Sequence, residues 1–561
     1  MELNDKIFYM KKRWLKISLY FFGTIVLLFI SLIIYLRAVA IVEPPQVKAT
    51  AIDSLEPTEV SKDFYRLKNN WFRKSESGLY ELYVEGDAYE RGIANGKLTK
   101  ELVQYQEEVF TNQIHRLVPS DFYLNILKYF VGWFNRNLAD NVIDEYQQEI
   151  YGVSQAASHQ FDDIAQPYQR ILNYHAAHDI GHALQNMSLV GCTSFAVWNG
   201  RAEDSTLTIG RNFDFYVGDE FARDKIIAFY KPKNGIPFMM VTFGGMTGVL
   251  SGMNNEGLTV TINAAKSEIP SASATPVSLV AREILQYAST IDEAYQIASK
   301  RKMFVAESFL IGSAKENKAV VIEKNPSGIG MYEAHQSQII CTNHFQSETL
   351  GNTELNKEHI RTSASPYRYH RVEELLSKDE KISVNDVASI LRNQLGIEDK
   401  DIGLGNEKAI NQLVAHHSVI FQPKKKLVWV STAPWQLGKY VCYDLNKVFS
   451  DEMATNHEIY DSTKTISADS FLNTKAFNDY VKFARYRFPF EPRTDMNPDS
   501  VVKWNPNLYH AYMLAGDFCF DKKQFQKAIE FYNEGLKKEI ATVQEREHMQ
   551  KNLEKSKEQS K

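Results

Sequence analysis

The sequence is poor in cysteine and has no excess of positive charge. Its four cysteines, Cys192, Cys341, Cys442 and Cys519, are far apart in a chain of 561 residues. That spacing predicts neither a disulfide framework nor a zinc site with paired CxxC ligands. Lysine and arginine number 64 against 69 aspartate and glutamate residues, which gives a net charge of −5. No basic field therefore argues for nucleic acid as a partner.

The sequence also lacks the HExxH motif of zinc peptidases. His175, His178, Asp179 and His182 do form a cluster, and the spacing of four between His178 and His182 could place both on one helix face. No distant ligand is identifiable, so polar helix packing is the stronger interpretation, with metal binding as the alternative. The pair His416-His417 is interpreted as structural in the same way. We expect no metal and no cofactor.

One long hydrophobic run is present near the N-terminus. Ile17 to Leu36 is uncharged and apolar, and twenty helical residues rise about 30 Å, enough to cross a bilayer. The basic residues Lys11, Lys12, Arg13 and Lys16 precede the run. The positive-inside rule then predicts a cytoplasmic segment 1–16, a membrane anchor 17–36 and an extracytoplasmic body. The alternative is a cleaved signal peptide ending near Ala38-Val39-Ala40; it also places the body outside the cytoplasm.

Two segments separate this run from Cys192. Residues 37–75 contain Pro44-Pro45 and mixed charge, which predicts a linker. Residues 76–191 are mainly of helical pattern and are expected to form a helical prosegment. This segment opens with a short apolar strand, Leu79 to Val84, and glycines four apart follow at Gly92 and Gly96. Glycines at that spacing on a helix suggest close packing on another element.

The pattern changes from helices to strands at Cys192. Short β-rich runs follow one another, two helices come after Thr275 and Thr290, and strands then resume. Strands, helices and strands in that order fit sheets layered with helices. Residues 192–460 are therefore expected to form one catalytic domain of α+β class.

The C-terminal part changes pattern again. Residues 461–503 are expected to be a connector, and 504–561 a helical hairpin with a charged tail that is frayed from Lys551 onward. The spacing of Gly516, Phe525, Ala528 and Tyr532 in the hairpin resembles one tetratricopeptide repeat. A single repeat cannot bury its own face, so the hairpin is expected to dock on the body. A protein partner at this hairpin is the other possibility.

Gly191 and Cys192 stand at the transition from helices to strands. A thiol can attack the preceding carbonyl and shift the acyl group from nitrogen to sulfur; hydrolysis of that thioester frees a new N-terminal cysteine. Glycine at the preceding position tolerates a strained backbone. The freed amine has a pKa of about 7.7–8.0 against about 8.5 for a thiol, so one residue supplies nucleophile and base. The alternative is that an isolated Gly-Cys is a small buried hydrophobe.

Charged and amide side chains follow at the ends of later strands. Arg211 can lower the pKa of a thiol, and Asp214 can hold an α-ammonium group or orient the amine. Asn263 and Asn343 end two apolar strands, where side-chain amides can form an oxyanion hole. The alternatives are a strand-end ion pair for the charged residues and turn chemistry for each asparagine.

Together these residues resemble the Ntn hydrolases of the acyl-coenzyme A:6-aminopenicillanic-acid acyltransferase type, which are relatives of choloylglycine (bile salt) hydrolase and acid ceramidase. The glycine motif between Gly86 and Gly96 is also similar to the N-terminal part of that family, and the resemblance covers roughly residues 76 to 445. The motifs that carry it are Gly191-Cys192-Thr193-Ser194, Gly210-Arg211-Asn212-Phe213-Asp214, the glycine-asparagine turn before Asn263, Thr342-Asn343, and Ser365-Pro366-Tyr367-Arg368-Tyr369-His370-Arg371.

The resemblance implies an αββα sandwich with Cys192 as the nucleophile. Arg211 and Asp214 would tune the thiol and the amine. Bile salt hydrolases carry their cysteine just after the initiator methionine, whereas here about 150 residues lie between the apolar run and Cys192. That arrangement resembles the self-cleaving acyltransferases and ceramidases, and implies a cut between Gly191 and Cys192.

The resemblance assigns the remaining site residues by position. Asn263 would be an oxyanion donor, with Asn254-Asn255 as the alternative, because Asn263 is one residue off the bile-salt-hydrolase spacing. Asn343 would hold the substrate or the tetrahedral intermediate. Arg368 would support the charge of the nucleophile, with Arg371 as the alternative.

We therefore expect hydrolysis of a linear amide bond through a Cys192 thioester, or acyl transfer if an amine or thiol replaces water. The acyl group could be fatty, bile-acid-like, or a peptide or antibiotic side chain, and membrane anchoring favours an amphipathic substrate. An alternative from another class is a catalytically inactive, membrane-tethered interaction module. A third possibility is an uncut precursor that still hydrolyses through Cys192.

Overall fold

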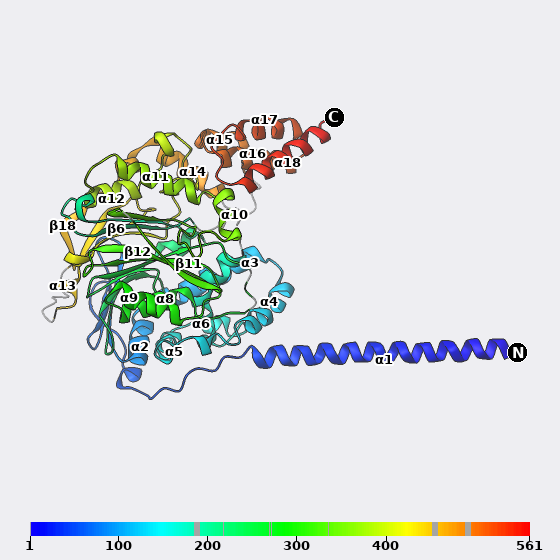
Figure 1. Cartoon of the computed structure of the whole chain (residues 1–561). Helices are drawn as coiled ribbons and strands as arrows, with labels where there is room; N and C mark the ends of the chain where they lie inside the picture. The colour runs from blue at the N-terminus through cyan, green and yellow to red at the C-terminus, as the bar shows by residue number, and fades with distance from the viewer. Residues whose placement is uncertain are drawn as a thin grey trace.

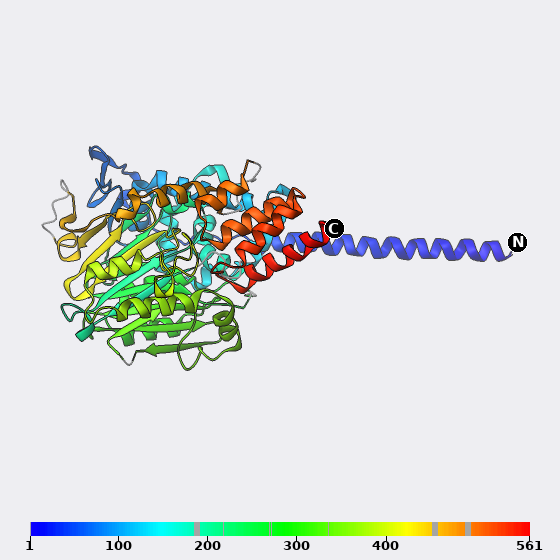
Figure 2. The same cartoon turned by 90° about the horizontal axis from the view of Figure 1, so that it is seen from above.

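The structure, a computed structural model, describes residues 2–184, 191–216, 218–268, 270, 272–334, 336–450, 458–487 and 495–561. Two β-sheets and the helices covering them form one body, from which helix α1 (Glu2–Val39) projects (Figure 1 and Figure 2). The mixed α and β content agrees with the helical and strand-rich segments expected from the sequence.

The larger sheet has eleven strands in the spatial order β1-β2-β3-β4-β7-β8-β9-β10-β11-β12-β13. Neighbouring strands are antiparallel except β4 and β7, which are parallel. The strands are β1 Thr58–Ser61, β2 Phe64–Leu67, β3 Asn70–Lys74, β4 Tyr80–Gly86, β7 Ile226–Pro232, β8 Phe238–Thr242, β9 Ser251–Asn254, β10 Leu258–Ala264, β11 Glu307–Ser313, β12 Lys318–Asn325 and β13 Gly328–Glu333.

The smaller sheet has seven strands in the order β14-β5-β6-β15-β16-β17-β18, and all its described pairs are antiparallel. Its centre joins strands that are about 200 residues apart in sequence, because β6 pairs with β15. The strands are β14 Gln338–Cys341, β5 Thr193–Val197, β6 Thr208–Phe213, β15 His417–Gln422, β16 Leu427–Ser431, β17 Tyr440–Asp444 and β18 Tyr460–Ile466.

Helices cover the outer faces of both sheets and form the C-terminal part of the chain (Figure 1). They are α1 Glu2–Val39, α2 Ala88–Leu98, α3 Lys100–Leu117, α4 Asp121–Phe134, α5 Asp144–Ser154, α6 Pro167–Leu184, α7 Asp219–Arg223, α8 Val277–Tyr287, α9 Ile291–Lys300, α10 Glu354–Thr362, α11 Ser365–Ser377, α12 Val384–Leu391, α13 Leu445–Val448, α14 Lys475–Arg487, α15 Pro498–Trp504, α16 Tyr509–Asp521, α17 Phe525–Gly535 and α18 Val543–Gln559.

Strand periodicity divides the core into layers. On β10, Val260 and Ile262 face the helices α2, α5, α6, α8 and α9 in one hydrophobic cluster. The alternate residues Thr261 and Asn263 face the smaller sheet, where both lie within hydrogen-bonding distance of Ser194 on β5. A second cluster fills the space between the sheets, and a third packs α11 and α12 on the outer face of the smaller sheet. The order is therefore helices, sheet, sheet, helices.

The described side chains of helix α1 are mostly exposed. Its segment Tyr9–Leu36 is long and apolar enough to cross a membrane, and no part of its apolar window is buried against the body. A signal sequence would pass the same test. The helix is therefore either a membrane span or a signal sequence, as the run Ile17 to Leu36 predicted.

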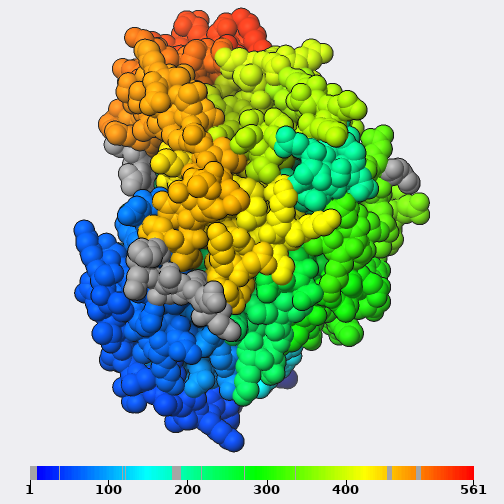
Figure 3. All heavy atoms as spheres, turned by 90° about the vertical axis from the view of Figure 1, so that its left-hand side faces the viewer, coloured from blue at the N-terminus to red at the C-terminus, as the bar shows by residue number. Residues whose placement is uncertain are grey.

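The segment 37–75, expected to be a linker, is partly sheet. Strands β1, β2 and β3 extend the larger sheet from β4, and Phe64, Trp71 and Phe72 are buried. Residues 461–503, expected to be a connector, are also partly sheet, because β18 is an edge strand of the smaller sheet. Figure 3 shows both segments on one face, the blue N-terminal strands beside the yellow-orange chain around β18. Ser75 Oγ donates to Glu458 at 2.6 Å across this boundary.

The C-terminal part has one helix more than the hairpin expected from the sequence. Helices α16 and α17 pack closely, because the Tyr532 ring lies against Gly516. Helix α18 follows and extends to Gln559, so the tail expected to be frayed from Lys551 is helical instead. Met549 and Leu553 account for this difference, since both are buried in the C-terminal hydrophobic cluster.

Candidate active site

Cys192 directly precedes β5 and is fully buried. Before it, the backbone N–H of Gly191 donates to the carbonyl oxygen of Asp214 at 2.9 Å. The thiol of Cys192 lies 3.9 Å from the same oxygen and 3.8 Å from Nη2 of Arg211. Antiparallel pairing of β5 with β6 produces this arrangement, because it sets Ser194 opposite Arg211. The structure therefore brings together the first three predicted site residues.

The guanidinium of Arg211 is buried and held by other strands. Nη1 donates to the carbonyl oxygen of Leu250 at 3.3 Å and to Ser251 Oγ, and Nη2 donates to the carbonyl oxygen of Ile262. The guanidinium carbon of Arg211 lies over the Phe213 ring, 4.4 Å from the centroid of that ring. A buried cation needs such polar and aromatic partners to offset its desolvation.

The histidine pair that the sequence suggested was structural lies beside Arg211. His417 Nε2 is 2.8 Å from Ser251 Oγ and 3.2 Å from Arg211 Nη1, and its Nδ1 is 2.9 Å from His416 Nδ1. Burial lowers the pKa of both rings well below the usual value, so both are neutral. His417 Nε2 therefore accepts from Arg211 and helps to fix its orientation.

Burial dominates the titration of the thiol and of Asp214. It raises the pKa of Cys192 to about 11 against the opposing charge of Arg211, so the thiol is protonated at neutral pH. It raises the pKa of Asp214 to about 7 against the charges of Arg368, Arg211 and Arg487. Neither carboxylate oxygen of Asp214 has a hydrogen-bond partner within the described part of the chain. Such buried, unsatisfied oxygens are uncommon in folded proteins and need an explanation.

The two predicted asparagines lie at neighbouring strand ends. Asn263 Oδ1 accepts from Ser194 Oγ at 2.8 Å, and its amide donates to the carbonyl oxygen of Cys341 at 3.1 Å. Asn343 donates to the carbonyl oxygen of Ala264 at 2.9 Å and accepts from Arg368 Nη2 at 2.6 Å. Each amide group therefore uses one hydrogen on the backbone and has a second hydrogen to offer.

The structure separates the alternatives that the sequence left open. Asn254 holds a turn: its Oδ1 accepts from the backbone of residues 256 and 258, and its amide donates to the end of α8. Arg371 points elsewhere, toward Glu374 and Asp399. Arg368 is the arginine that contacts Asn343, and its charge acts on Asp214. Asn254 therefore holds a turn and Arg371 an ion pair, whereas Arg368 contacts Asn343.

The histidine cluster before Gly191 is only partly described. His175 is buried between the carbonyl oxygen of Ile171 at 2.8 Å and Thr247 Oγ1 at 2.9 Å, and burial lowers its pKa to about 4. Asp179 accepts from the backbone N–H of Val277 at 2.9 Å. Both contacts are those of packing residues, and the side chains of His178 and His182 lie outside the described residues.

Sequence reasoning missed one residue at the predicted cut. The amide of Gln412 donates to the carbonyl oxygen of Gly191 at 2.8 Å, and Gln412 is buried. Gln412 comes 221 residues after Gly191 in the sequence, in the loop before β15. No motif surrounds it, so no local signal in the sequence could have identified it.

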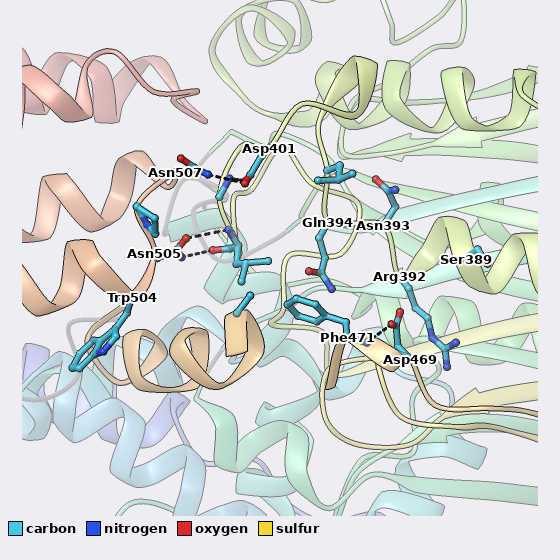
Figure 4. A pocket seen from close by; sticks show the side chains of 15 residues that line it. Ser389, Arg392, Asn393, Gln394, Asp401, Asp469, Phe471, Trp504, Asn505 and Asn507 are labelled. Atoms are coloured by element: carbon cyan, nitrogen blue, oxygen red, sulfur yellow. Dashed lines mark hydrogen bonds between the residues drawn. The ribbon is translucent and has the colours of Figure 1, made fainter. Parts of the chain in front are cut away.

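A cavity of about 630 Å³ lies apart from Cys192, between the loop after α12 and the C-terminal helices (Figure 4). Arg392, one of its lining residues, donates to backbone carbonyl groups of Gln436, Gly438 and Ser467. Asn505 and Asn507 are hydrogen-bonded to Leu404 and Asp401 across the cavity. The polar groups around it therefore serve to join two parts of the chain.

Comparison with known proteins finds similarities to part of the chain. Residues 201–433 match the model of the family described as acyl-coenzyme A:6-aminopenicillanic acid acyl-transferase. An N-acylethanolamine-hydrolyzing acid amidase of Caenorhabditis elegans is 26% identical over 208 residues, which are 36% of this chain and 56% of the relative. An uncharacterized protein of Archaeoglobus fulgidus is 23% identical over 258 residues, 43% of this chain and 42% of the relative. The chain spans about half the length of these relatives.

Two solved structures are also similar. The Caenorhabditis elegans ortholog of N-acylethanolamine-hydrolyzing acid amidase has a TM-score of 0.30 and 19% identity, with 42% of this chain and 93% of that chain covered. A variant of conjugated bile acid hydrolase from Clostridium perfringens has a TM-score of 0.32 and 14% identity, with 50% and 99% covered. The family match and the similarity to the acid amidase confirm the resemblance predicted from the sequence.

Proposed function

We propose that this chain, whose residues 201–433 match the acyl-coenzyme A:6-aminopenicillanic acid acyl-transferase family, is an Ntn hydrolase that cuts itself between Gly191 and Cys192. The observation that carries the proposal is the buried carboxylate of Asp214, whose two oxygens have no hydrogen-bond partner among the described residues. Its backbone carbonyl is already within 3.9 Å of the Cys192 thiol. An α-ammonium group released on Cys192 would give this carboxylate a charged hydrogen-bond donor.

The mature enzyme would use Cys192 to attack the carbonyl carbon of a linear amide. Arg211, 3.8 Å from the sulfur, would stabilise the thiolate. The oxyanion would accept from the free amide hydrogens of Asn263 and Asn343, and Arg368 would hold Asn343 in place. The α-amine of Cys192 would protonate the leaving amine and then activate water to hydrolyse the thioester. This chemistry uses no metal and no cofactor.

The uncut site is closed, so the cut would also open it. Cys192 has no solvent exposure in the continuous chain, and burial keeps its thiol protonated. Breaking the peptide bond would remove the covalent tie that holds Gly191 against Cys192. Departure of Gly191 would then open a path to the sulfur, so that cleavage and activation are the same event.

The substrate class follows from the family and from the anchor. The family is described by acyl transfer and the acid amidase relative by hydrolysis of N-acylethanolamines, so an amide or acyl small molecule is the substrate that fits. The exposed apolar helix α1 supports membrane attachment and an amphipathic substrate. In this proposal the N-terminus is cytoplasmic and the body extracytoplasmic.

The layering of helices, sheet, sheet and helices supports an αββα sandwich of Ntn-hydrolase type. In this proposal residues 76–191 form the prosegment and 192–460 the catalytic domain. The α16–α17 pair would be the single tetratricopeptide-like unit, and the loop before it contacts the body through Asn505 and Asn507. It is also the surface at which a protein partner would bind.

A denaturing gel of the purified full chain tests the proposal. We expect two fragments, the second beginning at Cys192 by N-terminal sequencing, and amide hydrolysis by the cut protein. Cys192→Ala should give one intact chain without activity. An intact wild-type chain that hydrolyses no amide in a screen of acylated amines would refute the proposal.

The full burial of Cys192 favours a second candidate, a catalytically inactive membrane-tethered module. In that case the thiol is a packing residue, and the wild-type chain would stay intact and unlabelled by a thiol-reactive acyl compound. The same gel therefore separates the two candidates. Labelling of an uncut chain at Cys192 would instead point to hydrolysis without self-cleavage.

A further inference from the structure

The contact between Gln412 and Gly191 has a chemical meaning if Gly191 is the residue cut. We propose that Gln412 is the oxyanion donor of the self-cleavage step, and that Arg487 of helix α14 holds it in position. This inference rests on the proposed self-cleavage. It adds a catalytic residue and a positioning residue for that step, and the positioning residue lies outside the matched range 201–433.

Gln412 touches the atom on which negative charge would develop. Its Nε2 donates at 2.8 Å to the carbonyl oxygen of Gly191, and both residues are buried, with Gln412 only 3% exposed. A preorganised amide donor at such an oxygen is the usual means of stabilising a tetrahedral intermediate. The asparagines of the candidate site, by contrast, donate to the carbonyl oxygens of Cys341 and Ala264.

Gly191 is required by the same contact. A Cβ atom at residue 191 would lie 2.2 Å from Nε2 of Gln412 and 2.5 Å from its Oε1. Any side chain would therefore push the amide away from the carbonyl oxygen that it bonds. This close approach explains a glycine at the position before the cut, where the backbone conformation alone would not demand one.

Helix α14 holds the loop that carries Gln412. Arg487 is buried, and its Nη1 donates to the carbonyl oxygen of Gln412 at 2.9 Å and to Tyr480 Oη at 3.0 Å. Tyr480 Oη donates in turn to the carbonyl oxygen of Leu413 at 3.4 Å. Leu413 has a φ of 54°, a left-handed conformation that a leucine keeps only when its surroundings impose it. Two side chains of α14 therefore fix the backbone on both sides of this strained point.

The step is balanced with water as the one co-reactant. The Cys192 sulfur bonds to the carbonyl carbon of Gly191 while its oxygen, carrying the negative charge, accepts from Gln412. The C–N bond then breaks, and the thiol proton ends on the nitrogen of Cys192, which leaves a thioester and a free amine. Water adds to the thioester and the C–S bond breaks, which gives the Gly191 carboxylate, restores the thiol and leaves one proton that passes to the free amine of Cys192.

The test measures the rate at which newly made full chain is converted to two fragments. Gln412→Met keeps the length of the side chain and removes the donor, so we expect cleavage to slow by about 10²–10³-fold, the usual effect of losing one oxyanion donor. Gln422→Met is the matched control, since Gln422 is also buried but bonds Thr208, and it should cleave at the wild-type rate. Equal rates for Gln412→Met and wild type would overturn the inference and leave self-cleavage standing. An uncut wild type would refute self-cleavage itself.

Two further measurements distinguish chemistry from folding. Gln412→Glu has no hydrogen to donate when ionised but regains one when protonated, so its rate relative to wild type should rise as the pH falls. A ratio that does not change with pH would contradict the donor role. Arg487→Met alone should slow self-cleavage relative to the wild type. Added to Gln412→Met it should have no further effect on the cleavage rate, because Arg487 acts through Gln412. Equal slowing in both backgrounds would mean that Arg487 serves only stability.

Discussion

The carboxylate of Asp214, which has no hydrogen-bond partner among the described residues, should make the uncut chain less stable as the pH rises. Burial moves its pKa from an ordinary value near 3.8 to about 7. Below pH 4 the group is protonated in both folded and unfolded chains, and stability is complete. Between pH 4 and 7 only the unfolded chain releases the proton, so the folded state loses up to about 4 kcal/mol, and the loss stops above pH 7.

The assay compares unfolding of Cys192→Ala with Cys192→Ala/Asp214→Asn from pH 4 to pH 8, in full chains that cannot cut themselves. We expect equal stability near pH 4, and the asparagine variant should be the more stable at pH 7 by an amount approaching 4 kcal/mol. Asp140→Asn, at an exposed carboxyl, is the matched control and should leave the pH profile unchanged. Parallel profiles for the Asp214 pair would refute the reasoning, since Asp214 would then be paired or exposed.

Three other substitutions probe the site and the C-terminal helices. Arg211→Lys keeps the charge but loses the fork that donates to two strands, so cleavage should slow at least about tenfold in the fragment assay. Gly191→Ala displaces the amide of Gln412 and should lower the cut fraction seen by densitometry. Gly516→Ala places a Cβ 2.5 Å from the Tyr532 ring and should destabilise the C-terminal helices by about 1–3 kcal/mol, measured by hydrogen exchange.

Each of these has a control and a contrary outcome. Gly200→Ala is the control for the two glycine variants, because its Cβ meets nothing within 4 Å, and it should behave as wild type. Arg223→Lys, at an exposed arginine, is the control for Arg211→Lys and should also behave as wild type. Normal cleavage of the Arg211 variant would mean that charge alone suffices. A wild-type cut fraction for the Gly191 variant would mean that the contact with Gln412 is irrelevant. Unchanged protection in α16 and α17 would show that the ring can move aside.

The sequence predicted the parts of the fold that depend on local periodicity. The change from helices to strands at Cys192 is observed, because β5 and β6 are short runs of buried residues directly after it. The strands β1–β3 and β18 were missed, since each is of mixed polarity, and β1 and β18 lie at sheet edges. Their residues become strands only because a neighbouring strand pairs with them, and one segment cannot reveal its partner.

Some residues of the candidate site could likewise be predicted from the sequence, and others could not. Arg211 and Asp214 lie within or beside β6, so motif order was enough to bring them to Cys192. Gln412 has no motif, because its role depends on a backbone carbonyl 221 residues away. The choice of Arg368 over Arg371 also needed the structure, since both lie on one helix and only contacts show which faces Asn343.

The parallel pairing of β4 with β7 joins the two sides of the proposed cut. Seven residue pairs, from Tyr80 with Ile226 to Gly86 with Pro232, link a strand before Gly191 to a strand after Cys192 within one continuous sheet. After self-cleavage the two pieces would thus remain a stable heterodimer without any disulfide. If α1 spans a membrane as proposed, the piece bearing it would hold the nucleophile-bearing piece at the lipid bilayer until a denaturant separates the two.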